Sequence, residues 1–230
     1  MDYLYLLLNL GSISIPFIFS FHPKLKFYKF YNSLALGIFI SMIVFVPWDI
    51  FFTIHGIWGF NERYFLGIKL FNLPMEEWLF FICIPYACVF THYALLYYFP
   101  KMKVSKGFTK KIGYFLLLTF LIVGVLNYNK WYTLINFLLA GLLIFLVLFK
   151  NLDILQTYFL TFLVMLIPFF IVNGILTGSF IENQVVWYNN NENLGIRLFT
   201  IPIEDTVYAF TLILINLFVI RLVEPKMSSK

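Results

Sequence analysis

The sequence GIKLFNLPMEE (Gly67 to Glu77) occurs a second time in the chain as GIRLFTIPIED (Gly195 to Asp205). Six of the eleven positions are identical, and the second position of the acid pair changes only from Glu to Asp. Each copy leads directly into a hydrophobic stretch long enough to cross a bilayer. Carboxylates at the entrance of a membrane helix are costly, so they indicate function. Two matched pairs predict a site built from both halves of the chain.

The composition excludes an ordinary soluble domain. Of the 230 residues 62% are hydrophobic and only 12% are charged, and the mean hydropathy is +0.89. A membrane helix needs about 20 apolar residues, and the apolar runs predict an all-α polytopic membrane protein with about seven transmembrane helices. The predicted spans are 3–21, 31–55, 76–99, 112–128, 131–149, 154–177 and 201–222, with 112–128 the shortest.

Basic residues predict the orientation, because cytoplasmic loops are enriched in Lys and Arg. Four basic residues lie on one predicted side: Arg63, Lys69, Lys130 and Arg197. The other twelve lie on the opposite side: Lys24, Lys26, Lys29, Lys101, Lys103, Lys106, Lys110, Lys111, Lys150, Arg221, Lys226 and Lys230. We therefore expect a multi-pass protein of a membrane such as the bacterial inner membrane, with the N-terminus outside and the C-terminus cytoplasmic.

The acids follow the opposite pattern, which places the expected chemistry in the outer half of the membrane. Nine of the eleven lie on or near the outer side: Asp2, Asp49, Glu62, Glu76, Glu77, Glu182, Glu192, Glu204 and Asp205. The net charge of +5 is then a signal of topology. We expect no nucleic-acid partner.

The internal repeat predicts the domain organisation. Residues 1–100 form a first three-helix repeat, 101–130 a linker with the fourth transmembrane helix, and 131–230 a second three-helix repeat. A single linking helix gives both repeats the same orientation, so they should be related by an axis along the membrane normal. His55-Gly-Ile and Asn173-Gly-Ile are read as equivalent, which makes the following loop ten residues longer in the second repeat.

The candidate catalytic residues are Glu76, Glu77, Glu204 and Asp205. Pro74 and Pro202 suit the first turn of a helix, where a missing N–H is harmless, so all four acids fall near a helix start. Neighbouring acids with different environments can provide one proton donor and one anion in the same site. The competing interpretation is simple helix capping at a wet interface.

Residues near the predicted level of the acids are candidates for binding a substrate or stabilising a cation. They are Trp48, Asp49, Trp58, Trp78, Trp187 and Tyr208. Aromatic faces attract cations in a dry site, although for each aromatic residue taken alone a belt at the membrane surface is the favoured interpretation. Asp49 is included because a lone acid in a membrane helix needs a reason. Lys69 and Arg197, as motif residues, either form salt bridges with the acids or tune them.

Several signatures are absent from the sequence, which narrows the chemistry. The chain has no dinucleotide-binding GxGxxG, no Gly-rich phosphate loop, no DxxxD pair with basic partners and no His cluster with metal spacing. Cys83 and Cys88 lie about 140° apart on a helix and indicate no disulfide. We therefore expect neither a cofactor nor a metal.

The doubled P-x-E-[ED] motif on a 3+1+3 membrane layout resembles the small integral-membrane lycopene cyclases. These occur as two separate subunits in some actinobacteria and as fused forms in other organisms, and this chain resembles a fused form. The resemblance covers nearly the whole chain and rests on Pro74-Met-Glu76-Glu77 and Pro202-Ile-Glu204-Asp205.

The resemblance implies an intramolecular lyase or isomerase of carotenoid biosynthesis that acts on lycopene or a related linear carotenoid. A carboxylic acid would protonate the terminal double bond, a neighbouring double bond would close a six-membered ring, and loss of a proton would complete a β-ionone ring. Other carotenoid-pathway enzymes are possible partners. Two alternatives remain open, a small-solute transporter with parallel repeats and a non-catalytic carotenoid-binding subunit.

Overall fold

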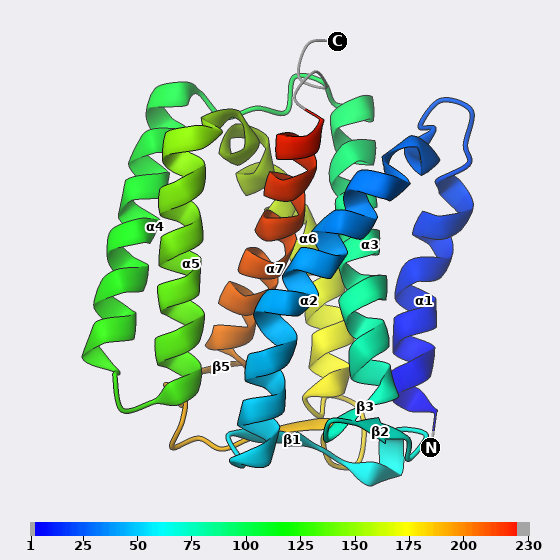
Figure 1. The fold of residues 1–230 in the computed structure, drawn as a ribbon, viewed down its shortest axis with the longest axis vertical. Helices are drawn as coiled ribbons and strands as arrows, with labels where there is room; N and C mark the ends of the chain where they lie inside the picture. The colour runs from blue at the N-terminus through cyan, green and yellow to red at the C-terminus, as the bar shows by residue number, and fades with distance from the viewer. Residues whose placement is uncertain (1–2, 225–230) are drawn as a thin grey trace.

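Seven α-helices run roughly along one direction in the computed structural model, which describes residues 3–224 (Figure 1). They are α1 Leu4–Phe19, α2 Tyr31–Ile54, α3 Met75–Tyr98, α4 Lys106–Leu126, α5 Trp131–Lys150, α6 Leu152–Leu176 and α7 Ile203–Val223. Six of the described helices, α2 to α7, are long and apolar enough to cross a membrane, and α1 is shorter with 16 residues. The predicted all-α polytopic membrane fold is confirmed.

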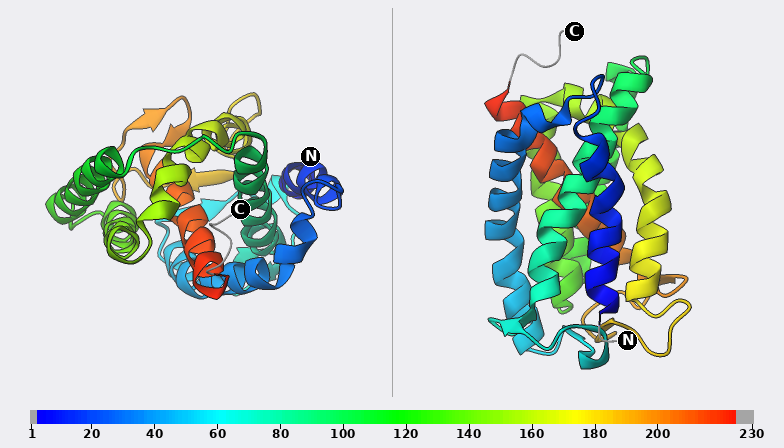
Figure 2. Two further views of the ribbon diagram at one scale, coloured as in Figure 1. Left: turned by 90° about the horizontal axis from the view of Figure 1, so that it is seen from above. Right: turned by 90° about the vertical axis from the view of Figure 1, so that its right-hand side faces the viewer.

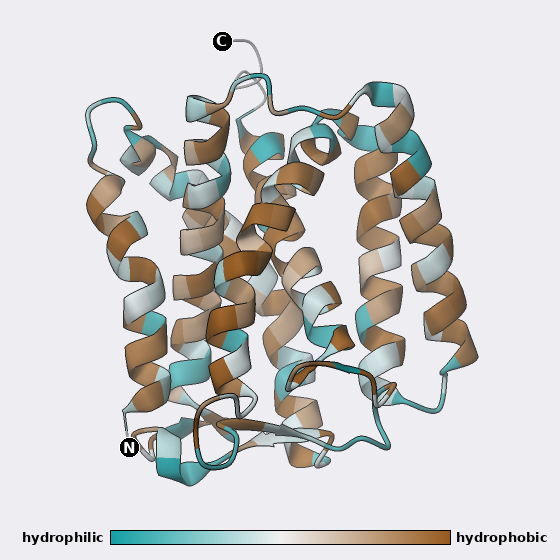
Figure 3. Cartoon of the chain, turned by 180° about the vertical axis from the view of Figure 1, so that it is seen from behind, coloured by the Kyte–Doolittle hydropathy of each residue, from teal (hydrophilic) through white to brown (hydrophobic). Residues whose placement is uncertain are grey.

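Hydropathy follows the membrane-spanning geometry. Apolar residues cover the middle of the helices, and hydrophilic residues gather at the two ends of the bundle (Figure 3). A side chain that faces lipid has no water to bond, so apolar surface is expected there. Asp2, Lys226 and Lys230, which contribute to the predicted orientation, lie outside the described residues.

Short strands, which the sequence did not predict, lie together at one end of the bundle (Figure 1). We call this the strand end. The strands are β1 Trp58–Phe60, β2 Lys69–Leu70, β3 Leu73–Pro74, β4 Val186–Tyr188, β5 Arg197–Leu198 and β6 Ile201–Pro202, with 3-10 turns at Phe27–Phe30 and Glu62–Tyr64. β1 and β4 pair antiparallel across the two halves, whereas β2–β3 and β5–β6 are hairpins directly before α3 and α7.

The two halves pack with a crossed arrangement. Within each half the first helix packs on the third, α1 on α3 and α5 on α7. Between the halves the middle helix packs on the third helix of the other half, α2 on α7 and α6 on α3. Seen along the bundle, α3 and α7 lie between α2 and α6 (Figure 2). Neither half can therefore bury its helices without the other.

The helix α4 breaks the symmetry, because it packs on α5 and α6 of the second half. It begins at Lys106, six residues earlier than predicted, because the side chain of Ser105 accepts a hydrogen bond from the N–H of Phe108 and caps the helix. Close packing of α4 on α5 uses small residues, as is usual between membrane helices. Gly113 lies against Leu148, at a distance that leaves no room for a side chain.

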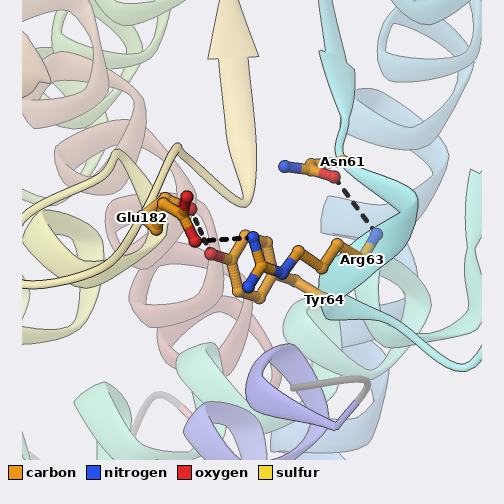
Figure 4. Close-up of polar contacts among 4 residues, drawn as sticks. All are labelled: Asn61, Arg63, Tyr64 and Glu182. Carbon is orange, nitrogen blue, oxygen red and sulfur yellow. Dashed lines mark hydrogen bonds and ion pairs between the residues drawn. The ribbon is translucent and has the colours of Figure 1, made fainter.

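The loops after α2 and α6 are joined at the strand end (Figure 4). Arg63 forms an ion pair of 2.8 Å with Glu182, and the Tyr64 hydroxyl donates to the backbone oxygen of Glu182. The backbone N–H of Arg63 donates to Asn61 at 3.1 Å. These contacts hold the connection of the first half against that of the second.

The predicted equivalence of His55 and Asn173 is wrong. His55 is the first residue after α2, whereas Asn173 lies inside α6, before its end at Leu176. The helix ends instead align Gly56 (φ 66°) with Gly178 (φ 109°), which both have left-handed backbone. Two positions separate Gly56 from β1 and eight separate Gly178 from β4. The second loop is thus longer by six residues rather than ten.

Candidate functional site

The repeated sequence folds into the same local structure twice. Gly67 (φ 80°) and Gly195 (φ 73°) take a left-handed conformation that glycine adopts without strain. The chain then forms a two-residue hairpin, which is closed by hydrogen bonds of 3.0 Å from Met75 to the Ile68 oxygen and from Ile203 to the Ile196 oxygen. This turn explains why the glycine is common to both copies and why a helix begins at the acids.

The two prolines lie one position earlier than predicted. Pro74 and Pro202 are the residues immediately before α3 and α7, and they also end β3 and β6. Their fixed φ of −56° in both cases suits an extended residue before a helix. The acids that follow therefore occupy the first turn, as expected.

The first acid of each pair turns back toward its own hairpin. Oε1 of Glu76 accepts a hydrogen bond of 2.8 Å from the N–H of Leu66. Oε1 of Glu204 accepts bonds of 2.7 Å from the N–H of Leu194 and from the hydroxyl of Thr133. Both side chains are fully buried, and their Oε2 atoms have no hydrogen-bond partner among the described residues. Glu76 and Glu204 thus fix the turn over the helix start.

The second acid of each pair accepts hydrogen bonds from tyrosine hydroxyls. Glu77 accepts a hydrogen bond from the hydroxyl of Tyr5. Asp205 accepts one of 2.5 Å from Tyr132 at Oδ1, and two at Oδ2, of 2.8 Å from Asn173 and 2.9 Å from Tyr188. Both acids are buried. Hydrogen bonds of this kind stabilise a carboxylate that burial would otherwise disfavour.

The helices α1 and α5 deliver equivalent partners to the two acid pairs. The Asn9 amide donates to the backbone oxygen of Glu76 at 2.8 Å, and the Asn136 amide donates to that of Glu204 at 2.7 Å. In each helix the asparagine follows the tyrosine by four residues, so that both lie on the same face. These tyrosines and asparagines were not among the predicted site residues. The repeated Tyr-x-x-x-Asn, at Tyr5 to Asn9 and Tyr132 to Asn136, was the available signal.

A third carboxyl joins the second acids. The Tyr208 hydroxyl lies 3.4 and 3.2 Å from the two oxygens of buried Asp49. The ring of Trp58 links Tyr208 to a partner of Asp205, with its centre 6.2 Å from that of Tyr208 and 5.0 Å from that of Tyr132. We call the three acids and their tyrosine partners the central cluster: Tyr5, Asp49, Glu77, Tyr132, Tyr188, Asp205 and Tyr208. All three carboxyls are buried, and buried carboxyls near one another cannot all be ionised at low cost.

Two of the four predicted tryptophans lie beside the central cluster. The Trp48 ring centre is 5.5 Å from that of Tyr208. Trp58 packs edge-to-face on Tyr132 at 5.0 Å and lies 6.0 Å from Tyr188. Both indoles are buried. The structure thus brings Trp48, Trp58 and Tyr208 together with the acids and provides an aromatic wall.

The other two tryptophans lie elsewhere. Trp78 is half-buried, donates to the backbone oxygen of Leu70 at 3.3 Å and contacts Phe71 of the hairpin. Trp187 is 37% exposed and lies against Gly59 at the strand end. It borders a hollow of about 500 Å³ that opens to the surface between the two halves. Their positions fit the membrane-surface interpretation of aromatic residues.

The two basic residues of the motif do not contact the acid pairs. Lys69 forms an exposed ion pair of 2.6 Å with Glu62. Arg197 donates to the backbone oxygen of Thr200 at 2.7 Å and to Asn190 at 2.9 Å. Its guanidinium carbon lies 5.9 Å from the ring centre of Tyr188. Salt bridges from Lys69 or Arg197 to the acid pairs are therefore not formed.

The family model described as "Lycopene cyclase" matches residues 2–95 and again residues 129–223. Each matched stretch contains one hairpin and one acid pair, and together they cover most of the chain. No curated protein and no solved structure matched. The two matches follow the two halves of the fold, and they show that this chain belongs to the lycopene cyclase family.

Proposed function

We propose that this protein is a lycopene β-cyclase that closes linear end groups to β-ionone rings by acid–base chemistry alone. The observation that carries the proposal is that Glu77 and Asp205, one from each half, are both buried and both accept hydrogen bonds from tyrosine hydroxyls. The pair supplies two groups that exchange protons within one site. Cyclisation of a polyene end is an isomerisation, so it needs no electron carrier, and we propose a cofactor-independent reaction.

The proposed reaction has three steps. A protonated carboxyl of the central cluster gives its proton to the terminal double bond and leaves a tertiary cation. The electron pair of a neighbouring double bond forms the ring bond and moves the cation into the ring. A carboxylate of the cluster then removes a ring proton, and the electron pair of that C–H bond becomes the ring double bond. One proton is added and one is lost, so the product is an isomer of the substrate.

The surroundings of the acids suit such a cation. A buried site excludes water, which would capture the cation as an alcohol. Carboxylates and the faces of Trp48 and Trp58 stabilise positive charge where it develops. A hydrocarbon substrate reaches the bundle through lipid. In the proposed orientation the strand end faces outward, because the described basic residues of the 1–2, 3–4 and 5–6 loops lie at the opposite end. The N-terminus is then outside and the C-terminus is cytoplasmic.

The first test is expression of the chain in a bacterium that accumulates lycopene, with chromatography of the pigments. The expected result is γ-carotene and β-carotene, with one and two rings. The double variant Glu77→Gln/Asp205→Asn, present in the membrane at the same level, is the inactive control. Unchanged lycopene with the natural chain would refute the proposal and would favour transport or carotenoid binding without catalysis.

The second test addresses the mechanism. Purified protein in liposomes with lycopene is placed in D₂O without any added cofactor. A carboxyl exchanges its proton with the solvent, so each new ring is expected to carry one deuterium. Product rings without deuterium, or conversion that requires an added electron carrier, would refute acid–base cyclisation.

A further inference from the structure

We propose that the central cluster is asymmetric in function, with Asp205 as the anion of the resting site, Glu77 as the proton donor and Tyr188 as the positioning residue that distinguishes them. This inference rests on the proposed cyclase function and assigns the two carboxyls, which the repeated sequence leaves equivalent. It arises from one difference between the halves, at equivalent positions of the strands β1 and β4.

The strands β1 and β4 show which residues are equivalent. They pair antiparallel with Gly59 opposite Trp187, Trp58 opposite Tyr188 and Phe60 opposite Val186. The pairing is centred on Gly59 and Trp187, so Phe60 and Tyr188, which follow these two residues, are equivalent. The separation of Phe60 from Tyr188 in the sequence is also the same as that of Glu77 from Asp205. The ring contacts agree, because Phe60 stacks on Tyr5 with centres 6.4 Å apart, and Tyr188 stacks on Tyr132 at 5.8 Å. The second half therefore has a hydroxyl where the first half has none.

The hydroxyl changes the number of hydrogen bonds at the two acids. Asp205 accepts from Tyr132, Asn173 and Tyr188. Glu77 accepts from Tyr5 alone among the described residues. Each donor favours the charged form of a carboxyl over the neutral form. Burial opposes the charged form of both acids, and so do the other carboxyls near them. The second carboxyl therefore holds the negative charge, and the first keeps the proton.

Tyr188 itself remains a donor. Burial, followed by the charge of Asp205, raises the pKa of the Tyr188 hydroxyl well above its ordinary value. The hydroxyl is thus protonated throughout the working range of pH. Asn173 lies on α6, in the same half as Asp205, and its amide nitrogen has no other ionisation state to adopt. Both residues act through Asp205 and do not need to touch the substrate.

The assignment fixes the direction of proton flow. The O–H bond of Glu77 breaks as the new C–H bond of the substrate forms, and the cation develops between the two acids. After ring closure, the proton lost from the ring goes to Asp205, and its C–H electron pair forms the ring double bond. Asp205 then releases this proton to the solvent and Glu77 takes one up from it, which restores the starting state, so no oxidant or reductant is consumed.

The first experiment exchanges the hydroxyl between the halves. Tyr188→Phe removes one donor from Asp205, and Phe60→Tyr adds one to Glu77. Both variants are expected to lower kcat for lycopene about tenfold with KM changed less than about twofold, because a hydrogen bond to a charged group is worth about one decade in an equilibrium. Tyr64→Phe is the control, since it removes a tyrosine hydroxyl from the strand end whose one partner among residues 3–224 is the Glu182 backbone.

The hydroxyl exchange separates positioning from structural support. If Tyr188 were only structural, Tyr188→Phe would be impaired and Phe60→Tyr, which loses no contact, would keep its full kcat. That result would overturn the inference. Equal losses in Tyr64→Phe and Tyr188→Phe would overturn it as well, since they would reflect general loosening of the strand end.

The second experiment measures charge without turnover. The probe is a polyene with a tertiary amine at one end, whose protonated nitrogen imitates the ring cation. Binding in lipid nanodiscs is followed by quenching of tryptophan fluorescence. Asp205→Asn is expected to weaken binding at least tenfold, which is about the effect of removing one close charge partner, while Glu77→Gln weakens it less than about threefold. The reverse order would overturn the assignment.

The two experiments also distinguish this inference from the proposed function. If the natural chain leaves lycopene unchanged, the cyclase proposal fails, whatever the variants do. If it cyclises lycopene but the amine binds Glu77→Gln and Asp205→Asn equally, the cyclase proposal stands and the asymmetric assignment fails.

Discussion

The first half of the bundle (α1 to α3) and the second half (α5 to α7) build the same site with different polar contacts. Both use a glycine turn, a hairpin, a buried first Glu, and a Tyr and an Asn from the leading helix. They differ at the second acid, because among the described residues Asp205 accepts three hydrogen bonds and Glu77 accepts one. The comparison teaches that the repeat fixes the position of an acid, whereas a few neighbours set its hydrogen bonds.

The strongest test of the comparison separates the halves. Each half expressed alone, cut within the loop 99–105, is expected to give no cyclised product, because α2 packs on α7 and α6 packs on α3. Co-expression of the two pieces is expected to restore activity in the membrane. Pigment chromatography gives the readout, and the uncut chain is the control. Activity from one half alone would contradict a site shared by both proposed repeats.

The next test removes one acid at a time. Glu77→Gln and Asp205→Asn each keep the side-chain shape and are each expected to slow cyclisation at least about 100-fold, the usual contribution of a positioned acid or base. Conversion of lycopene is measured at matched protein levels in the membrane. A variant that retained more than a tenth of the natural rate would remove that acid from the proposed mechanism.

The first acids provide a contrasting pair. Glu76→Ala leaves the Leu66 N–H without its acceptor and is expected to cost about 1–3 kcal/mol of stability, whereas Glu76→Gln keeps an acceptor oxygen and costs less. Glu204→Ala is expected to cost more than Glu76→Ala, since Glu204 also accepts from Thr133. Thermal unfolding in detergent measures the difference. Loss of cyclisation in a fully stable Glu76→Gln would instead indicate a chemical role for the first acid.

The tyrosines of α1 and α5 should be unequal. Tyr5→Phe removes the described hydroxyl donor of Glu77, which carries the proton in the resting site, and is expected to lower the rate about threefold. Tyr132→Phe removes a donor from the anion Asp205, as Tyr188→Phe does, and is expected to lower the rate about tenfold. Initial rates in liposomes measure both variants. Equal losses would show that both acids depend on their hydroxyl donors to the same degree and would argue against the asymmetric assignment.

The smallest effects are expected at the motif cations. Lys69→Ala breaks an exposed ion pair with Glu62 and should leave both rate and melting temperature unchanged, because exposed pairs contribute little. Arg197→Ala loses bonds to Thr200 and Asn190 and should lower the melting temperature slightly. A large loss of activity in Lys69→Ala would show that the cation tunes the acids at a distance.

The sequence by itself determined the membrane class, the helices and the acids. Long runs of apolar residues are stable in lipid, and their lengths, about 20 residues each, match the thickness of a bilayer and so set the spans. The repeated GIKLFNLPMEE and GIRLFTIPIED located the helix starts and all four acids, because a turn with a positive φ requires glycine and a buried acid requires a reason. These features are local in the chain, so one sequence carries them.

The tertiary structure alone decided how the acids divide. Adjacent acids point in directions about 100° apart, and only packing of α1, α5 and the hairpins shows that Glu76 and Glu204 turn back to the hairpins while Glu77 and Asp205 bond to tyrosines. Tyr5, Tyr132 and Tyr188 reach the acids from 72, 73 and 17 positions away. Trp78 and Trp187 were predicted near the level of the acids on the same grounds as Trp48 and Trp58, but they lie outside the cluster. A hydrogen bond depends on distances in space, which the order of residues does not fix.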